Sequence, residues 1–199
     1  PFCPQTISPR AISQFLSLNY ILTDSCILEN VYKLPPAHYM LIQKGETPVS
    51  KPYWSLADQF KAPKWNLPPH ELSDFLSASL DSKVQNCMLS DVPLGAFLSG
   101  GIDSSAIVAS MAKHQNSKQV KTFTIGFEDN SFDELDKAQY VASYINVDHH
   151  WEKVSVDGLS LLPKIVEAAD EPFADTSMIP VYVLAAMASK NVTVCLSGD

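Results

Sequence analysis

Short apolar runs in the second part of the chain alternate with longer stretches in which apolar residues recur at helical spacing. The short runs predict β-strands over residues 94–98, 120–127, 150–156 and 192–196. The stretches between them predict helices over residues 106–112, 134–145, 159–169 and 179–189. Because strands that alternate with helices are joined by right-handed crossovers, this order predicts an α/β fold: a doubly wound, mostly parallel sheet with helices on both faces.

Residues 1–65 follow a different pattern. Prolines interrupt them at Pro4, Pro9, Pro35, Pro36, Pro48, Pro52 and Pro63. Between the prolines, residues 11–19 predict a short helix, and residues 39–42 predict a short strand before the Lys44-Gly45 turn. We therefore expect a connector, or the tail of another domain, over residues 1–65 and the α/β domain over residues 66–199.

A further helix is predicted to begin at Pro68-Pro69, where these two regions meet. Its apolar residues recur at helical spacing and predict one apolar stripe, made of Leu72, Phe75, Leu76, Leu80, Val84, Cys87 and Met88. The sequence shows no internal repeat and no low-complexity segment.

Charge and composition argue against two classes of binding partner, nucleic acids and membranes. The 199 residues carry 14 Lys+Arg against 22 Asp+Glu, a formal net charge of −8. This acidic balance argues against a broad nucleic-acid footprint and against a patch for anionic membranes. The longest apolar stretch, residues 178–188, contains Pro180 and is shorter than the roughly 20 residues that span a bilayer. We expect neither nucleic acid nor a membrane as a partner.

The four cysteines, Cys3, Cys26, Cys87 and Cys195, are scattered, with no Cys-x-x-Cys pair and no histidine at finger-like spacing. Structural zinc is therefore not expected. Spacing leaves disulfides open, but a chain that can bury a large core does not need them, so a cytoplasmic location is favoured. Neither end resembles a native terminus, and we interpret the chain as an excerpt from a longer protein.

The strongest chemical signal is the segment 98–105 (LSGGIDSS), between a predicted strand and a predicted helix. Paired glycines allow a tight turn, and the N–H groups that begin a helix attract anions, so the segment predicts a phosphate-binding loop. Asp103 would repel a phosphate unless a cation lies between them, which points to Mg²⁺. The alternative is a glycine turn before a helix that Asp103 or Ser104 caps.

This loop resembles the pyrophosphate-binding loop of the N-type ATP pyrophosphatases, and further segments in the same order make the chain similar to asparagine synthetases. They are residues 122–127 (TFTIGF), 132–134 (FDE), 149–150 (HH), 170–175 (DEPFAD) and 194–199 (VCLSGD). Residues 31–38 (VYKLPPAH) and 53–54 (YW) resemble that family's passage from the glutaminase to the synthetase domain. The chain departs from the family at Ala37, where a Pro-Pro-Gly-His turn is usual.

The resemblance implies an adenine nucleotide alpha-hydrolase-like fold and an ATP-dependent amide ligase, in which the side-chain carboxylate of aspartate is adenylated and ammonia then displaces AMP. The nucleotide-binding residues that it implies are Leu98, Ser99, Gly100, Gly101, Ser104, Ser105, Ile125, Gly126, Ser197 and Gly198. It implies catalytic roles for Asp103, Glu134 and Asp199, with Asp103 and Glu134 as Mg²⁺ ligands. Glu134 also suits an ordinary first-turn position of a helix.

The resemblance further implies aspartate, ATP and glutamine-derived ammonia as substrates and a glutaminase domain in the same parent chain; it leaves a homodimer open. Cys3 does not match the N-terminal nucleophile of such a glutaminase. The chain alone is therefore expected neither to hydrolyse glutamine nor to complete amide transfer. Two alternatives remain: a related ligase with a different carboxylate substrate, and a non-catalytic interaction module.

Other polar residues have plainer explanations. His149 and His150 are adjacent on a predicted strand and face opposite ways, so a metal between them is not expected. Asp170 and Glu171 lie near a helix end, where carboxylates are usually solvated. Ser177 or Asp175 is expected to cap the helix that follows.

Overall fold

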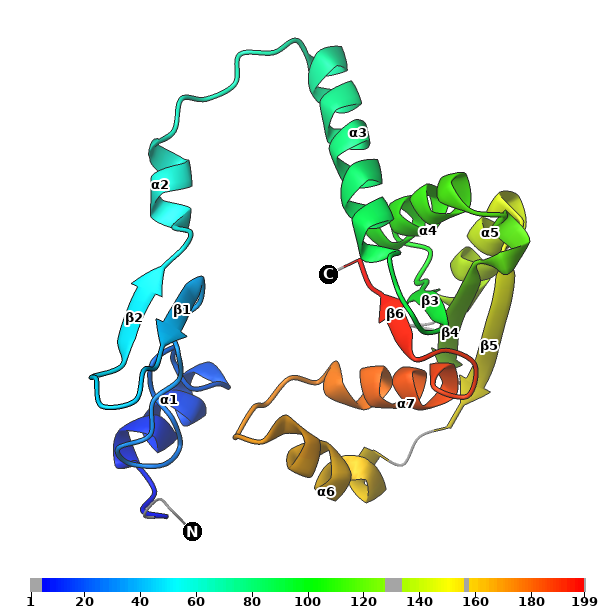
Figure 1. Cartoon of the computed structure of the whole chain (residues 1–199). Coiled ribbons are helices and arrows are strands. Elements are labelled where there is room, and N and C mark those ends of the chain that lie inside the picture. The colour runs from blue at the N-terminus through cyan, green and yellow to red at the C-terminus, as the bar shows by residue number, and fades with distance from the viewer. Residues whose placement is uncertain (1–4, 128–133, 156–157, 199) are drawn as a thin grey trace. The chain divides into compact units, whose positions relative to one another are not determined.

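A computed structural model describes residues 5–127, 134–155 and 158–198 (Figure 1). Contacts between residues divide the chain into two compact units. The N-terminal unit consists of residues 1–66 and 161–176, and the sheet unit consists of residues 67–160 and 177–199. One division thus falls beside the boundary expected at residue 65, whereas residues 161–176 group with the N-terminal unit instead of with the α/β domain.

The N-terminal unit contains short elements. Helix α1 (Pro9–Leu18) begins where the Ser8 side chain accepts a hydrogen bond from the N–H of Ala11 at 3.3 Å. Strands β1 (His38–Leu41) and β2 (Val49–Pro52) pair antiparallel, and α2 (Leu56–Lys61) follows. The sequence indicated α1 and β1 but neither β2 nor α2, because β2 is exposed throughout and shows no alternation, and α2 has only six residues.

Residues 161–176 join this unit through contacts distant in the sequence. The Lys33 ammonium lies 2.8 Å from the Glu171 carboxylate and also donates to the carbonyl of Ile21 at 3.2 Å. The N–H of Ala174 donates to the carbonyl of Asn19 at 2.8 Å. Such pairings leave no local pattern, so sequence reading placed this segment with its neighbours in the chain.

The sheet unit is built on four strands: β3 (Leu94–Phe97), β4 (Lys121–Phe127), β5 (Asp148–Val154) and β6 (Val194–Leu196). Their order is β5-β4-β3-β6 and every pairing is parallel. The helices of this unit are α3 (Pro69–Cys87), α4 (Ile102–His114), α5 (Leu135–Ile145) and α7 (Met178–Ala188), with a 3₁₀ turn at Ser117–Gln119. Helix α6 (Gly158–Ala169) begins in the sheet unit, and from residue 161 onward it belongs to the N-terminal unit. The predicted α/β class with a parallel sheet is confirmed.

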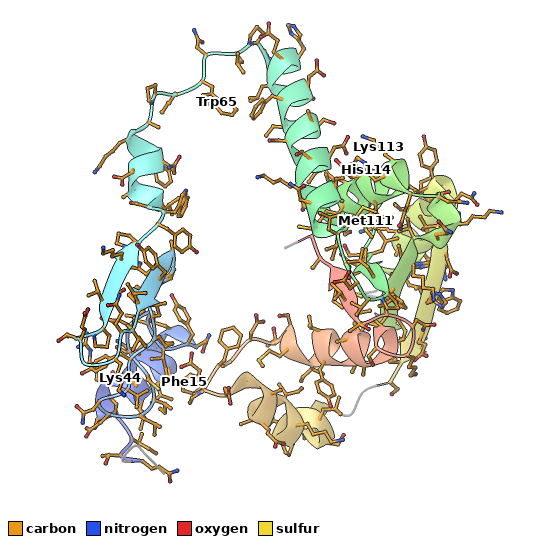
Figure 2. All side chains as sticks on the ribbon, viewed as in Figure 1. Phe15, Lys44, Trp65, Met111, Lys113 and His114 are labelled. Atoms are coloured by element: carbon orange, nitrogen blue, oxygen red, sulfur yellow. The ribbon has the colours of Figure 1, made fainter. Side chains whose placement is uncertain are left out.

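Helices cover both faces of the sheet (Figure 1). On one face, α3, α4 and α5 pack over β3 and β4 around a core that includes Ala96, Val108 and Met111. Met111, labelled in Figure 2, is fully buried, whereas Lys113 of the same helix pairs with Asp81 of α3 at 2.8 Å. On the other face, α7 packs over β4 in a second core, whose members are Phe123, Met187, Ala188 and Val192.

The predicted apolar stripe of α3 is only partly used. Val84 is buried, and Leu80 and Met88 pack against the first core. Phe75 and Leu76, nearer the start of the helix, are 45% and 57% exposed. The periodicity therefore predicted the helix correctly. It did not show that only the carboxyl-terminal part of the apolar stripe is packed against the core. Among the described residues, none of the helices combines the length and the apolar content that a bilayer crossing requires.

Candidate functional site

A cavity of about 560 Å³ lies at the carboxyl ends of the strands in the sheet unit. The chain leaves β3 toward β4 on one side, and β6 lies on the other side, so the strand order reverses beside β3. Ligands of open α/β sheets bind at such reversals. The lining combines the loop after β3, the start of α4, Glu134, the start of α7 and the turn after β6.

The loop after β3 is held by its own serines. The Ser104 hydroxyl accepts a hydrogen bond from the N–H of Ser99 at 3.2 Å and lies 2.9 Å from the Ser99 hydroxyl. Ser99 Oγ in turn accepts from the N–H of Gly101 at 3.2 Å. The loop is anchored to the sheet below because the Thr124 hydroxyl donates to the carbonyl of Leu98. These bonds fold the loop over the first turn of α4.

Two glycines allow the elements around the loop to approach closely. Gly100 has φ +76°, and a Cβ there would lie 2.6 Å from the backbone carbon of Lys137 in α5. A Cβ on Gly198 would lie 2.7 Å from the backbone nitrogen of Ser104 in α4. A side chain at either position would therefore push apart the elements that enclose the cavity.

Asp103 and Glu134 are the charged side chains in this lining, as far as the structure describes it. Asp103 lies in the first turn of α4, and Glu134 stands immediately before α5. Both residues are exposed to solvent. Because the described lining includes no lysine, arginine or histidine, an anionic ligand there needs a cation or backbone N–H groups as partners.

The donor set fits Mg²⁺ held partly by a ligand. Mg²⁺ is usually bound by one or two carboxylates together with substrate phosphates and water. Asp103 and Glu134 supply two carboxylates to one cavity. Within the described ranges there is no cluster of three or more His, Cys, Asp or Glu side chains placed to hold a metal without a ligand.

Most of the expected nucleotide-binding residues come together in the cavity. Those that line it, with Asp103 and Glu134, are Leu98, Ser99, Gly101, Ser104, Ile125, Ser197 and Gly198. Gly100, Ser105 and Gly126 do not line it. Gly100 packs instead against α5, and the Ser105 hydroxyl is buried without a partner among the described residues. Asp199, Cys3 and residues 132–133 lie outside the described residues.

Sequence reasoning missed Phe97, Thr124, Pro180, Val181 and Leu184 as lining residues. Phe97 ends β3 beside the expected Leu98, and Thr124 precedes the expected Ile125 within β4, so their positions in the strands could have suggested them. The three residues of α7 carried no signal, because apolar residues at helical spacing also describe a helix packed in a core.

The remaining sequence candidates lie elsewhere. Glu171 pairs with Lys33 within the N-terminal unit. Ser177 precedes α7 but makes no side-chain capping hydrogen bond, so the cap expected of Ser177 is not formed. A second cavity of about 630 Å³, beside α5 and β5, is lined by residues that include Gln139 and His149 and contains none of the predicted site residues.

The two adjacent histidines of β5 have different surroundings. His149 Nδ1 lies 2.9 Å from the Thr122 hydroxyl, and partial burial, with a smaller contribution from His150, lowers the pKa of His149. His150 Nε2 lies 3.1 Å from the Asp148 carboxylate, and its ring stacks on Phe123. Each imidazole therefore has a structural partner of its own.

Fold and cavity together define a doubly wound α/β domain with a serine-glycine loop at the point where the strand order reverses. The family model for asparagine synthase matches residues 76–199. Asparagine synthetase (glutamine-hydrolyzing) 1 of Bacillus subtilis (strain 168) is 37% identical over 194 residues, which cover 97% of this chain and 30% of that protein. The chain therefore belongs to the asparagine synthase family and spans about a third of the length of this relative.

Other similarities are more distant. A protein named Amidase chry2, from Gibberella zeae, is 32% identical over 145 residues, which cover 66% of this chain and 22% of that protein. Among solved structures, the NMN synthetase of Francisella tularensis gives a TM-score of 0.43 at 17% identity, covering 67% of this chain and 56% of that one.

Proposed function

We propose that the sheet unit binds ATP with Mg²⁺ and forms the adenylating part of a glutamine-dependent asparagine synthetase. The observation that carries the proposal is the convergence of the Ser99–Ser104 loop, Asp103, Glu134 and Gly198 on one cavity at the reversal of strand order. Membership of the asparagine synthase family supports the same reaction class. A cytoplasmic location and a glutaminase domain in the parent protein belong to this proposal, and a homodimer remains open.

The residues of the cavity suit the departure of pyrophosphate. In the proposed reaction an oxygen of the aspartate side-chain carboxylate bonds to the α-phosphorus of ATP, and the bond from that phosphorus to the bridging β-phosphate oxygen breaks. Ser99 and Ser104 line the cavity, and α4 begins beside them. In this proposal their hydroxyls and the N–H groups at the start of α4 bind the departing anion. Mg²⁺, when held by Asp103 and Glu134, would neutralise its growing charge.

A second step follows from the same proposal. Ammonia attacks the acyl carbon of the aspartyl adenylate, AMP leaves with the electron pair of the broken bond, and the attacking nitrogen loses one proton, so the products are an amide, AMP and a proton. The chain alone is proposed not to supply the ammonia from glutamine. A related ligase that adenylates a different carboxylate is the second candidate, and the similarity to a protein named Amidase chry2 indicates that chains of this kind also occur in proteins named for another amide reaction.

Calorimetric titration of the chain with ATP, with and without Mg²⁺, tests the nucleotide site. Asp103→Asn should weaken Mg²⁺-dependent ATP binding by about tenfold or more, because it removes a proposed metal ligand. The matched control is Asp136→Asn, which removes an exposed carboxylate from the first turn of α5 outside the cavity lining and should leave binding unchanged. Equal binding by the two variants would favour a non-catalytic module.

ATP–pyrophosphate exchange in the parent protein then identifies the acid. Exchange that needs L-aspartate and disappears in Asp103→Asn supports aspartate adenylation. Exchange that needs another carboxylate, with ATP binding intact, moves the function to the related ligase. Absence of ATP binding by a folded chain overturns the proposal.

A further inference from the structure

The first peptide group of the loop after β3 is held by side chains from two other elements. The strand ladder ends at Phe97, whose register partner on β4 is Phe123. One residue further on, the N–H of Leu98 still donates to the carbonyl of Phe123 at 3.0 Å. The peptide group that joins Leu98 to Ser99 comes next, and side chains provide its hydrogen bonds.

Both polar groups of this peptide have a partner. The carbonyl of Leu98 accepts a hydrogen bond from the hydroxyl of Thr124 on β4. The N–H of Ser99 donates to the hydroxyl of Ser104 on α4 at 3.2 Å. Because a peptide group is planar and its carbonyl and N–H point in opposite directions, these two bonds fix the orientation of the plane. The chain therefore enters the loop in one direction.

The bond from Thr124 lies in a buried part of the sheet unit. Leu98 is 2% exposed and Thr124 is 4% exposed. Since a buried carbonyl without a donor costs free energy, removal of the Thr124 hydroxyl would favour rotation of this peptide toward another donor. Such a rotation would move Ser99 and Gly100, and a Cβ on Gly100 would already lie 2.6 Å from the backbone of α5. The orientation of one peptide group thus affects the whole loop.

We infer that Thr124 is a positioning residue of the nucleotide site, and that its hydroxyl sets the orientation of the loop by holding the Leu98 carbonyl. This inference rests on the proposed function, in which the loop binds phosphates. Thr124 also lines the cavity, but a hydroxyl has a single proton, and Thr124 donates it to Leu98. The ionised oxygens of a phosphate accept hydrogen bonds and donate none, so Thr124 acts on the ligand through the loop.

Thr124→Val tests the inference, because valine has nearly the shape of threonine and lacks the hydroxyl. The variant should bind MgATP about tenfold more weakly, and inorganic pyrophosphate with Mg²⁺ about tenfold more weakly as well. The two losses should be equal, since the loop binds the part that both ligands share. Thr124→Ser keeps the hydroxyl and should bind both ligands within about threefold of the unchanged chain. Calorimetric titration of the full chain measures the affinities.

The matched control is Thr122→Val on the same strand. Thr122 is fully buried, lies on the same face of β4 as Thr124, and its hydroxyl is 2.9 Å from Nδ1 of His149. Thr122 is not among the described residues that line the cavity. Thr122→Val should therefore lower the midpoint of thermal unfolding about as much as Thr124→Val does, yet leave both affinities within about twofold of the unchanged chain.

Equal loss of both ligands in Thr124→Val, with recovery in Thr124→Ser and no loss in Thr122→Val, supports the inference. Unchanged binding by Thr124→Val, loss of MgATP alone, or an equal loss in Thr122→Val or in Thr124→Ser overturns it while the nucleotide site stands. If the unchanged chain binds neither ligand, the proposed function and this inference fail together.

Thr124→Cys replaces Thr124→Val if the valine variant does not fold. A thiol is a weaker hydrogen-bond donor than a hydroxyl, so Thr124→Cys should bind both ligands about threefold more weakly than Thr124→Ser does. Equal binding by the cysteine and serine variants would overturn the inference.

Discussion

The two units of the chain use β-structure in opposite ways. In the sheet unit, Ala96, Val120 and Phe123 are fully buried between helices. In the N-terminal unit, β1 and β2 form an antiparallel backbone ladder, yet Leu41 is 55% exposed and β2 is exposed throughout. Strand pairing satisfies the hydrogen-bonding groups of the backbone in both units. Only in the sheet unit do helices cover both faces of the strands and make them a rigid support. The candidate site lies on that support.

The largest expected contrast comes from removing a core aromatic residue and an exposed aliphatic one. Phe123→Ala should lower the free energy of unfolding of the sheet unit by about 3–5 kcal/mol, because it opens a cavity between β4 and α7. Leu41→Ala should change the stability of the N-terminal unit by about 0.5 kcal/mol or less. Urea unfolding followed by circular dichroism measures both. Similar losses in the two variants would mean that β1 is packed as firmly as the central sheet.

Two glycines with positive φ, one in each unit, allow the packing of the two units to be compared by substitution. Gly45 of the N-terminal unit, with φ +85°, has open space around a Cβ, whereas Gly100 of the sheet unit would place a Cβ against the backbone of α5. Gly45→Ala should lower stability by about 1–2 kcal/mol from backbone strain alone. Gly100→Ala should lower it further and also weaken MgATP binding, since the loop must shift. Equal losses in stability, measured by urea unfolding, would contradict the close packing of the loop on α5.

Ala37 offers a gain in stability within the less packed unit. It has φ +57° in the Pro35–His38 turn, a conformation that glycine adopts without strain. Ala37→Gly should therefore raise the free energy of unfolding by about 1 kcal/mol, because relief of strain exceeds the added flexibility of the unfolded chain. Thermal unfolding measures the change. A lower midpoint than that of the unchanged chain would mean that the turn tolerates alanine better than its φ indicates.

His149 makes the smallest expected contribution, through pH. Its pKa is lowered in the folded chain, chiefly by burial, from the ordinary 6.5, so the unfolded chain takes up the proton at a higher pH than the folded chain does. The contribution of the neutral imidazole to the free energy of unfolding is complete above the unfolded-chain pKa of about 6.5. It decreases as the pH falls toward the lower pKa of the folded chain. His149→Gln should flatten the decline in unfolding free energy between pH 7 and pH 5.

The control for this titration is His70→Gln, because the His70 side chain of α3 is 77% exposed. The slope of its unfolding free energy against pH is the reference for the loss of an exposed imidazole. If His149→Gln and His70→Gln give the same slope, burial of His149 does not contribute to the acid sensitivity of the sheet unit.

The elements that the sequence predicted well carry strong local signals. Strands β3 and β4 are short apolar runs beside turn residues, and α5 ends at the left-handed Asn146. Strand β2 and helix α2 lack both periodicity and length, so the pattern missed them. For the site, the sequence drew attention to residues 98–105 because paired glycines and Asp103 stand between a predicted strand and a predicted helix, and their role in binding a nucleotide stays a prediction.

Hydrophobic period and turn chemistry are local properties, so the alternation of strands and helices and the residues that follow each strand could be read from the sequence alone. Tertiary structure alone decided that Gly198 abuts α4, that Glu171 pairs with Lys33, and that Val181 stands at the cavity. Each of these facts depends on elements far apart in the chain. Many arrangements of these helices and strands would satisfy the same local pattern, and side-chain packing selects one of them. These contacts can therefore be seen only in the folded chain.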